Sequence, residues 1–306
     1  MSSAYPNPTD HNASREPLRQ PFSVADDRKL VFWHWPQHAG LPRLHWAHAT
    51  GFHARTYTPL LDRLSGNWNV VAWDMRGHGA SHAAALAQKL HHWDTYYRDL
   101  TQWLDEQNEP VWLAGHSIGA TISLVAAARR PGQVAGLLLA EPVLLAGWPR
   151  WLVKFARLAG ATARLPHPAA ARARRSHFPS KSQAMNVYRG RGAFATWPDE
   201  WLAAYVAHGL IAEGNNFRLA CSPAWEADTF ASVDPDSITD IKALQCPLLV
   251  LQGTRQSTVF DRARAGLERR APAARFEAVA NTTHFLPMEQ PEAIVRGLSG
   301  LFAEAS

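Results

Sequence analysis

The sequence contains little cysteine, with only Cys221 and Cys246 in 306 residues. The two do not form a C-x-x-C pair, so we expect neither a disulfide framework nor a zinc cage. The 15 histidines include no H-E-x-x-H pattern, and we predict no metal site and no need for an organic cofactor. So little cysteine suits a reducing compartment, and we expect a cytoplasmic protein.

Long hydrophobic runs are absent as well. No stretch approaches the roughly 18 consecutive apolar residues typical of a membrane helix, so no membrane span is expected. The opening sequence, MSSAYPNPTDHNASREPLRQP, is polar and rich in proline, and it lacks the basic start and apolar core of a secretory signal. We predict that residues 1–21 form a flexible N-terminal arm.

Acidic residues are missing from one long segment. Between Pro142 and Pro198 there is no Asp or Glu, although the segment holds ten basic residues. A solvated basic face is one interpretation, and attraction of an anionic ligand or an acidic surface is the other. No nucleic-acid-binding module is recognisable, so no nucleic-acid partner is expected. The ten residues are Arg150, Lys154, Arg157, Arg164, Arg172, Arg174, Arg175, Lys181, Arg189 and Arg191.

The sequence does contain a regular alternation of strand-like and helical segments. Several strand-like segments are apolar at nearly every position, which is typical of strands buried on both faces. Segments with helical spacing separate them, so we predict an α/β protein with a mostly parallel central sheet flanked by helices. The predicted strands are 30–35, 43–49, 68–74, 111–115, 134–141, 247–253 and 274–280, and the predicted helices are 57–66, 93–108 and 119–130.

The alternation stops over residues 144–240. This segment shows no clear strand, but it has helical patches at 151–165 and 199–210. A chain of this length suits one large domain with an insertion. We therefore predict a core formed by residues 22–143 and 241–306, with residues 144–240 inserted as a helical cap.

One serine stands at the corner between a buried strand and a helix. The sequence GHSIG at 115–119 matches G-x-S-x-G, and Ser117 is its central residue. In a strand–turn–helix of this kind the strained backbone projects the hydroxyl above the sheet, and the flanking glycines remove Cβ atoms that would collide. The start of the helix also favours developing negative charge. Ser117 is therefore predicted to be a nucleophile.

A serine nucleophile needs a base, and the segment after the last predicted strand supplies His284. The elbow at Ser117, HATGFHA after an early strand, WDMRGHGAS after the next and THFLPMEQPE near the end together resemble the α/β-hydrolase family. The resemblance extends from about residue 22 to about residue 302. It implies that DMRGHG is a structural turn and that residues 144–240 are the cap of that family.

The resemblance also implies an oxyanion hole. In this family one amide comes from the loop after the early strand and the other from the residue after the nucleophile, which here are Thr50 and Ile118. Two backbone N–H groups aimed at the developing oxyanion would stabilise it. We expect the substrate to contact residues beside these amides and beside the nucleophile, namely His48, Gly51, Phe52 and His116.

The acid that orients the histidine is not where the family usually has it. The loop after strand 247–253 carries Gln256, which cannot supply a negative charge, in place of an aspartate. Glu141 ends the strand before the insertion, and some members of the fold take their acid from that strand end. We predict Glu141 as the acid, and the alternatives are Asp261, Asp234, Asp236 and Asp240.

These residues predict a serine hydrolase that cleaves an ester-like acyl bond through an acyl-enzyme. Fold alone does not separate esters from lactones, thioesters, amides or carbon–carbon bonds. A second hypothesis is a catalytically silent protein of the same fold that binds a small molecule. The arginines and tryptophans of residues 144–240 suggest an anionic or aromatic acyl substrate. The sequence does not define the oligomeric state.

Overall fold

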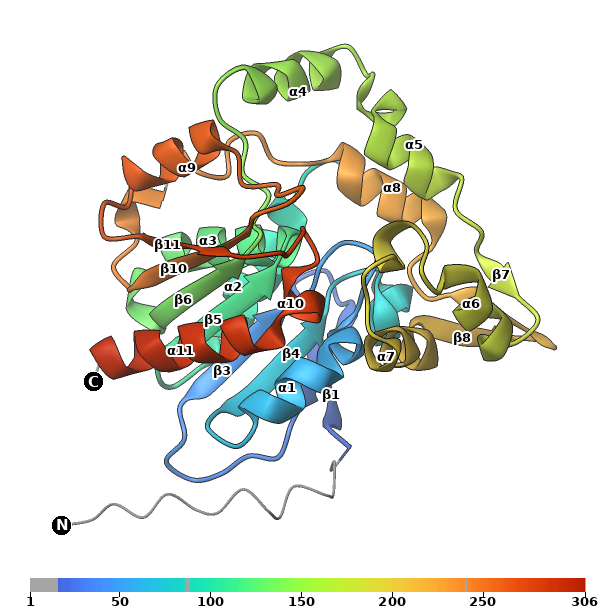
Figure 1. Ribbon diagram of the computed structural model, residues 1–306, viewed down its shortest axis with the longest axis horizontal. Helices are drawn as coiled ribbons and strands as arrows, with labels where there is room; N and C mark the ends of the chain where they lie inside the picture. Colours follow the sequence, from blue (N-terminus) through green and yellow to red (C-terminus); the bar gives the residue numbers. More distant parts are fainter. Residues whose placement is uncertain (1–15, 86–88, 240, 306) are drawn as a thin grey trace.

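An eight-stranded sheet forms the centre of the molecule (Figure 1). The computed structural model describes residues 16–85, 89–239 and 241–305. The strand order is β1-β2-β4-β3-β5-β6-β10-β11, and only the β1–β2 and β2–β4 pairs are antiparallel. All seven predicted strands are present, so the predicted mostly parallel sheet is confirmed. The strands are β1 (Leu18–Ser23), β2 (Lys29–His34), β3 (Arg43–Ala47), β4 (Asn69–Asp74), β5 (Val111–His116), β6 (Val134–Ala140), β10 (Leu248–Gly253) and β11 (Arg275–Val279).

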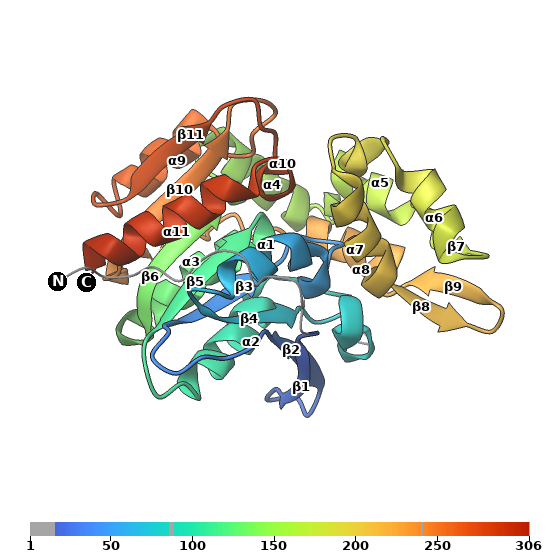
Figure 2. The same ribbon diagram turned by 60° about the horizontal axis from the view of Figure 1, so that its bottom comes forward.

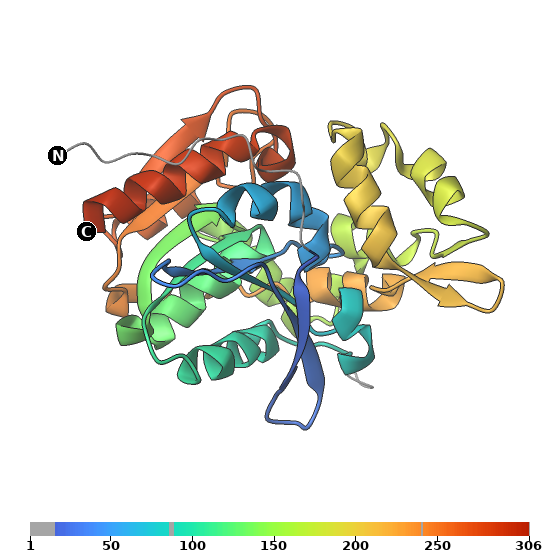
Figure 3. The same ribbon diagram turned by 90° about the horizontal axis from the view of Figure 1, so that it is seen from below.

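Helices cover both faces of this sheet (Figures 1 and 3). α1 (Thr58–Leu64) and α11 (Pro291–Ala305) pack on one face, and α2 (Asp94–Asp105) and α3 (Ile118–Arg129) pack on the other. The pleat of β6 divides its leucines between the two layers, because successive side chains point to opposite faces. No helix among residues 16–85, 89–239 and 241–305 is long and apolar enough to span a membrane.

The remaining helices outside residues 144–240 are short. They connect the strands or begin the loops at the carboxyl ends of the strands. They are α9 (Asp261–Glu268), α10 (Leu286–Glu289), and the 3₁₀ helices η1 (Ala54–Tyr57), η2 (Gly79–Ala84), η3 (Pro131–Gln133) and η6 (Ile241–Ala243).

The segment 144–240, called the insertion below, forms a separate group of elements beside the sheet (Figure 2). Its interpretation as strand-free is wrong, because it contains a three-stranded antiparallel sheet in the order β7-β9-β8. These strands are short and partly exposed, so they lack a buried pattern. Only the Gly214-Asn215 turn signalled the hairpin. The elements are α4 (Trp148–Leu158), η4 (Thr162–Arg164), α5 (Pro166–Arg172), β7 (His177–Phe178), α6 (Lys181–Tyr188), η5 (Gly192–Phe194), α7 (Asp199–Gly209), β8 (Leu210–Glu213), β9 (Asn216–Leu219) and α8 (Pro223–Ala231).

The predicted N-terminal arm ends earlier than residue 21. β1 begins at Leu18 and pairs with β2 along its whole length, so residues 18–21 belong to the sheet. The strand was missed because its side chains are almost all exposed, and only Phe22 packs on the core, with its ring centroid 5.4 Å from that of Phe32. Residues 1–15 of the predicted arm lie outside the described residues.

Several histidines are buried in the core, where a charged imidazole is costly. Burial lowers the pKa of His45 to about 3, and the nearby His34 lowers it further. Burial likewise lowers the pKa of His53 and of His78, each to about 4. These rings are therefore neutral in the folded protein at pH 7, whereas in the unfolded chain they would titrate near 6.5.

This difference predicts a loss of stability in mild acid. Below pH 6.5 the unfolded chain binds protons that the folded protein refuses, so the free energy of unfolding falls with pH until the folded pKa is reached. At pH 5 each of the three rings contributes a loss of about 2 kcal/mol. We expect the melting temperature to fall steeply between pH 6.5 and pH 5. In His45→Phe the slope should be shallower, and in His38→Gln, at an exposed position, it should match the wild type. A melting temperature that stays constant over this range would contradict the prediction.

Candidate active site

Ser117 lies in a sharp turn between β5 and α3. Its backbone adopts φ 58° and ψ −122°, a conformation that side-chain-bearing residues rarely adopt, and its N–H donates to the carbonyl of Ala140 in β6 at 3.0 Å. A Cβ on Gly115 would lie 2.6 Å from the carbonyl carbon of Gly119, and a Cβ on Gly119 would lie 2.3 Å from the carbonyl oxygen of Ala47. Both glycines are therefore required for the turn to approach α3 and β3 so closely.

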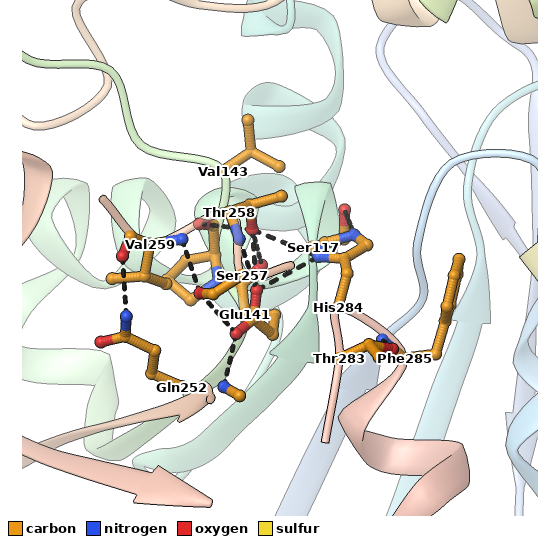
Figure 4. A network of polar contacts seen from close by, with 12 residues as sticks. Ser117, Glu141, Val143, Gln252, Ser257, Thr258, Val259, Thr283, His284 and Phe285 are labelled. Carbon is orange, nitrogen blue, oxygen red and sulfur yellow. Dashed lines mark hydrogen bonds and ion pairs between the residues drawn. The ribbon is translucent and has the colours of Figure 1, made fainter. Parts of the chain in front are cut away.

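Ser117, His284 and Glu141 form a chain of two contacts, with His284 in the middle (Figure 4). The Ser117 Oγ is 3.1 Å from His284 Nε2, and His284 Nδ1 is 3.3 Å from Glu141 Oε2. The three residues come from the ends of β5, β6 and the loop after β11. The carboxyl ends of parallel strands meet at one edge of the sheet, which brings together residues far apart in the sequence.

The Glu141 carboxylate is fully buried and hydrogen-bonded on both oxygens. Oε1 accepts from the Gly253 N–H at 2.6 Å and the Ser257 hydroxyl at 2.8 Å, and Oε2 accepts from the Thr258 N–H at 2.8 Å. Burial by itself would raise the pKa of Glu141, but the hydrogen bonds from His284, Thr258, Gly253 and Ser257 outweigh it and hold the pKa below its usual range. The group is thus a carboxylate next to His284 at neutral pH.

Sequence reasoning missed the part played by the loop after β10. Thr258 Oγ1 donates to Glu141 Oε2 at 3.0 Å and lies 3.2 Å from His284 Nδ1, so it contacts both members of the pair. Gln256, at the position where an acid is usual, is exposed and has φ 50°. The signal that could have revealed this role was the pair of hydroxyl residues, Ser257 and Thr258, directly after the missing acid.

The alternative acids are engaged elsewhere. Asp234 accepts from the Tyr97 hydroxyl at 3.1 Å, and Asp236 pairs with Arg150 and Lys154 of α4. Asp261 is an exposed residue in the first turn of α9, and Asp240 lies outside the described residues. In the described part of the chain, no group of three or more His, Cys, Asp or Glu residues is arranged to hold a metal ion.

The two amides predicted for the oxyanion hole lie in the loop after β3 and at the start of α3. Ile118 is the first residue of α3, so its N–H has no acceptor within the helix. The Thr50 N–H has no acceptor among the described residues. Gly51 follows Thr50 at φ 77°, and a Cβ there would lie 2.5 Å from Glu226 Oε1 of α8. The insertion therefore packs directly against this loop.

Two of the four residues predicted to contact substrate have side chains that are buried and hydrogen-bonded within the protein. His48 is fully buried, with Nδ1 bonded to the Ala49 carbonyl at 2.8 Å and Nε2 accepting from the Met75 N–H at 2.9 Å. His116 is also fully buried, and it lies 2.7 Å from the Tyr57 hydroxyl through Nδ1 and 2.7 Å from the His284 carbonyl through Nε2. These side chains have no free polar atom for a ligand, and their prediction as substrate contacts is corrected: they support the loops around Ser117.

Phe52 lies in a cluster of aromatic rings that also contains Phe285, the residue after His284. Its centroid is 5.0 Å from Trp197 of the insertion and 6.4 Å from Phe285, which follows His284. Trp197 and Phe285 are 6.0 Å apart. One ring thus comes from each of three segments, namely the loop after β3, the insertion and the loop after β11. Together they form an apolar cluster next to His284, whose ring centroid is 5.6 Å from that of Phe285.

A mostly parallel sheet with a serine at the sharp turn after β5 and a histidine after the last strand is the arrangement of the α/β-hydrolase fold. Comparison with known proteins agrees. The family model described as serine aminopeptidase, S33, matches residues 42–291, which include Ser117, Glu141 and His284. The chain belongs to this family of serine hydrolases.

Individual relatives are more distant. Human monoglyceride lipase is 31% identical over 152 residues, a match that covers 45% of this chain and 50% of that protein. The chain thus matches about half the length of this curated relative. Two solved structures share the fold over almost the whole chain, although sequence identity is low. E-2-(acetamidomethylene)succinate hydrolase has a TM-score of 0.72 at 18% identity and covers 94% of this chain and 99% of its own. An esterase from Mycobacterium tuberculosis has a TM-score of 0.70 at 20% identity and covers 95% of this chain and 92% of its own.

Proposed function

We propose that this chain hydrolyses carboxylic esters, with Ser117 as nucleophile, His284 as general base and Glu141 as the acid that orients the histidine. The observation that carries the proposal is the unbroken line of contacts from the serine hydroxyl through both ring nitrogens to a buried carboxylate. A nucleophile, a base and an orienting group in this geometry are the parts that a serine hydrolase uses for acyl transfer.

In the first half of the reaction, His284 Nε2 takes the proton of the Ser117 hydroxyl while Oγ forms a bond to the ester carbonyl carbon. The carbonyl oxygen becomes an oxyanion, which the N–H groups of Thr50 and Ile118 would stabilise. The imidazolium then gives its proton to the leaving alkoxide, and the carbon–oxygen ester bond breaks. Water, deprotonated by the same nitrogen, attacks the acyl-serine, releases the carboxylic acid and restores the hydroxyl.

Glu141 supports these proton transfers because it fixes the tautomer and the orientation of His284. A proton on Nδ1 donates to Glu141 Oε2, which leaves Nε2 unprotonated and facing Ser117. The negative charge also stabilises the imidazolium that forms in each half-reaction. The Thr258 hydroxyl supports the pair, since it holds Oε2 in place and lies within reach of Nδ1.

We further propose that the insertion is the cap of the site and that the acyl group is apolar. Trp197 of the insertion meets Phe52 and Phe285 beside the serine and histidine, and Glu226 contacts the oxyanion loop at Gly51. Such a wall excludes water and favours an apolar substrate group. The names of two relatives, a lipase and an esterase, support an ester as the scissile bond.

Initial rates on p-nitrophenyl esters of increasing acyl length test this proposal. We expect turnover, and we expect Trp197→Ala to lower kcat/KM for hexanoate by about 10-fold or more, chiefly through KM, with a smaller effect on acetate. Trp197→Phe should retain most of the wild-type rate. Trp148→Ala, which removes an exposed tryptophan of α4, should leave both rates unchanged.

Other outcomes would overturn parts of the proposal. Turnover of p-nitroanilides or thioesters in preference to esters would replace the ester by another acyl bond. A folded protein that turns over none of these substrates would favour the silent binding protein. An equal loss on acetate and hexanoate in Trp197→Ala would remove the acyl-group assignment.

A further inference from the structure

The helix α4 presents an apolar face to solvent. Among the described residues, five of the eight exposed large hydrophobic side chains lie on this one helix, and each of the five is more than half exposed. Their spacing of three and four residues places them on one side of the helix. We call this set the α4 apolar face, and its members are Trp148, Trp151, Leu152, Phe155 and Leu158.

The orientation of α4 is the reverse of that of an ordinary surface helix. Arg150 and Lys154 pair with Asp236, and Arg157 donates to the carbonyls of Ser232 and Val233 at 3.2 and 2.6 Å. The charged face therefore holds the helix to the protein, and no residue of α4 is buried. An amphipathic helix normally packs its apolar face inward. The reversal leaves the apolar side of α4 without a packing partner among the described residues.

The helix also lies at the rim of the molecule and close in sequence to the site (Figure 1). It begins seven residues after Glu141. Between them, Val143 is fixed to α3, because its N–H donates to the Thr121 hydroxyl at 3.1 Å and its carbonyl accepts from that hydroxyl at 2.9 Å. A surface bound by α4 would therefore lie beside the edge of the sheet that carries the site.

The side chains around the α4 apolar face are basic rather than acidic. Residues 142–198 contain no acidic side chain. Arg164 lies in η4 just beyond the end of α4, and Arg262 lies against Gly147 at its start, 3.1 Å from the position of a Cβ there. Neither arginine has an acidic partner in the described part of the chain. Within the residues that the structure describes, each end of the α4 apolar face thus carries an arginine without an acidic partner.

We propose that α4 docks the protein on an anionic lipid surface, with the α4 apolar face inserted among the acyl chains and Arg164 and Arg262 at the headgroups. Tryptophan, phenylalanine and leucine beside basic side chains are the composition of helices that lie in the membrane interface. A second copy of the chain fits less well, because it would bring like charges together over one helix about 16 Å long. The proposal goes beyond ester hydrolysis and does not depend on Ser117.

Co-sedimentation of the full chain with vesicles tests it. The vesicles are phosphatidylcholine alone or phosphatidylcholine with phosphatidylglycerol, and the variant is Phe155→Ser with Leu158→Ser. We expect the wild type to bind the anionic vesicles more tightly than the neutral ones. The double variant should bind at least about 10-fold more weakly, since two apolar side chains lose their burial. The matched control is Leu18→Ser, which removes a leucine from β1 that is also more than half exposed and should bind like the wild type.

The same proteins separate this proposal from the proposed function. Hydrolysis of p-nitrophenyl acetate in the absence of vesicles should be equal in the wild type and the double variant, because both replaced side chains are exposed and outside the site. Equal vesicle binding by the wild type and the double variant would overturn the lipid proposal while leaving ester hydrolysis intact. Failure of the wild type to bind either kind of vesicle would also overturn the lipid proposal. A wild-type dimer that the double variant converts to monomer, without vesicle binding, would assign the face to a second copy.

Discussion

Replacing Ser117 with alanine is expected to lower kcat for ester hydrolysis by roughly 10⁴- to 10⁶-fold. The Oγ at 3.1 Å from His284 Nε2 is the atom proposed to form the acyl bond, and alanine leaves the site without a nucleophile. The measurement is the initial rate on a p-nitrophenyl ester, together with mass spectrometry of the protein after reaction with an activated fluorophosphonate. The wild type should gain one adduct on Ser117, and Ser117→Ala should gain none there.

Ser123→Ala is the matched control for this loss. Ser123 lies six residues further along, in α3, is fully buried, and its Oγ has no hydrogen-bond partner among the described residues. Alanine is favoured in a helix, so this variant should fold and retain most of the activity. If Ser117→Ala kept more than a tenth of the wild-type rate, or if the adduct formed on another serine, the assignment of the nucleophile would be wrong.

Glu141→Gln is expected to lower kcat by about 10⁴-fold, the cost of the same change of acid to amide in a serine-protease triad. The amide removes the charge that would stabilise the imidazolium. It also places an NH₂ group against donors, because Gly253, Ser257 and Thr258 all donate to the carboxylate. The measurement is kcat and KM at several pH values, together with the melting temperature, which separates a catalytic loss from unfolding.

Gln256→Ala supplies the control for the acid. Gln256 stands where the family usually has its carboxylate, but it is exposed, and we expect its replacement to change kcat by less than about twofold. A loss at Gln256 as large as the loss at Glu141 would place the orienting group on the β10 loop instead. A Glu141→Gln protein that is folded and fully active would remove the acid from the proposal.

Much of the architecture follows from local pattern. Strands such as β5, apolar at almost every position, are buried on both faces and so belong to a parallel sheet covered by helices. The G-x-S-x-G turn is local too, because close packing against neighbouring backbone demands its two glycines. Elements that bury few side chains were missed, because the sequence pattern reveals an element only through its regularly spaced buried residues. β1 and the small sheet of the insertion each bury only a few side chains, such as Phe22 and Phe178, which is too few to leave a hydrophobic period in the sequence.

The sequence by itself determined the alternation of strands and helices, the serine at the elbow, and a short list of histidine and acid candidates at strand ends. Only the tertiary structure decided which of these meet. Glu141 contacts His284 across 143 residues because β6 and the loop after β11 end at one edge of the sheet. Tertiary packing also decided that the ring nitrogens of His48 and His116 are hydrogen-bonded within the protein. It likewise decided that the charged side of α4 faces the protein. Each of these contacts depends on residues that are distant in the sequence, so a local sequence pattern cannot predict it.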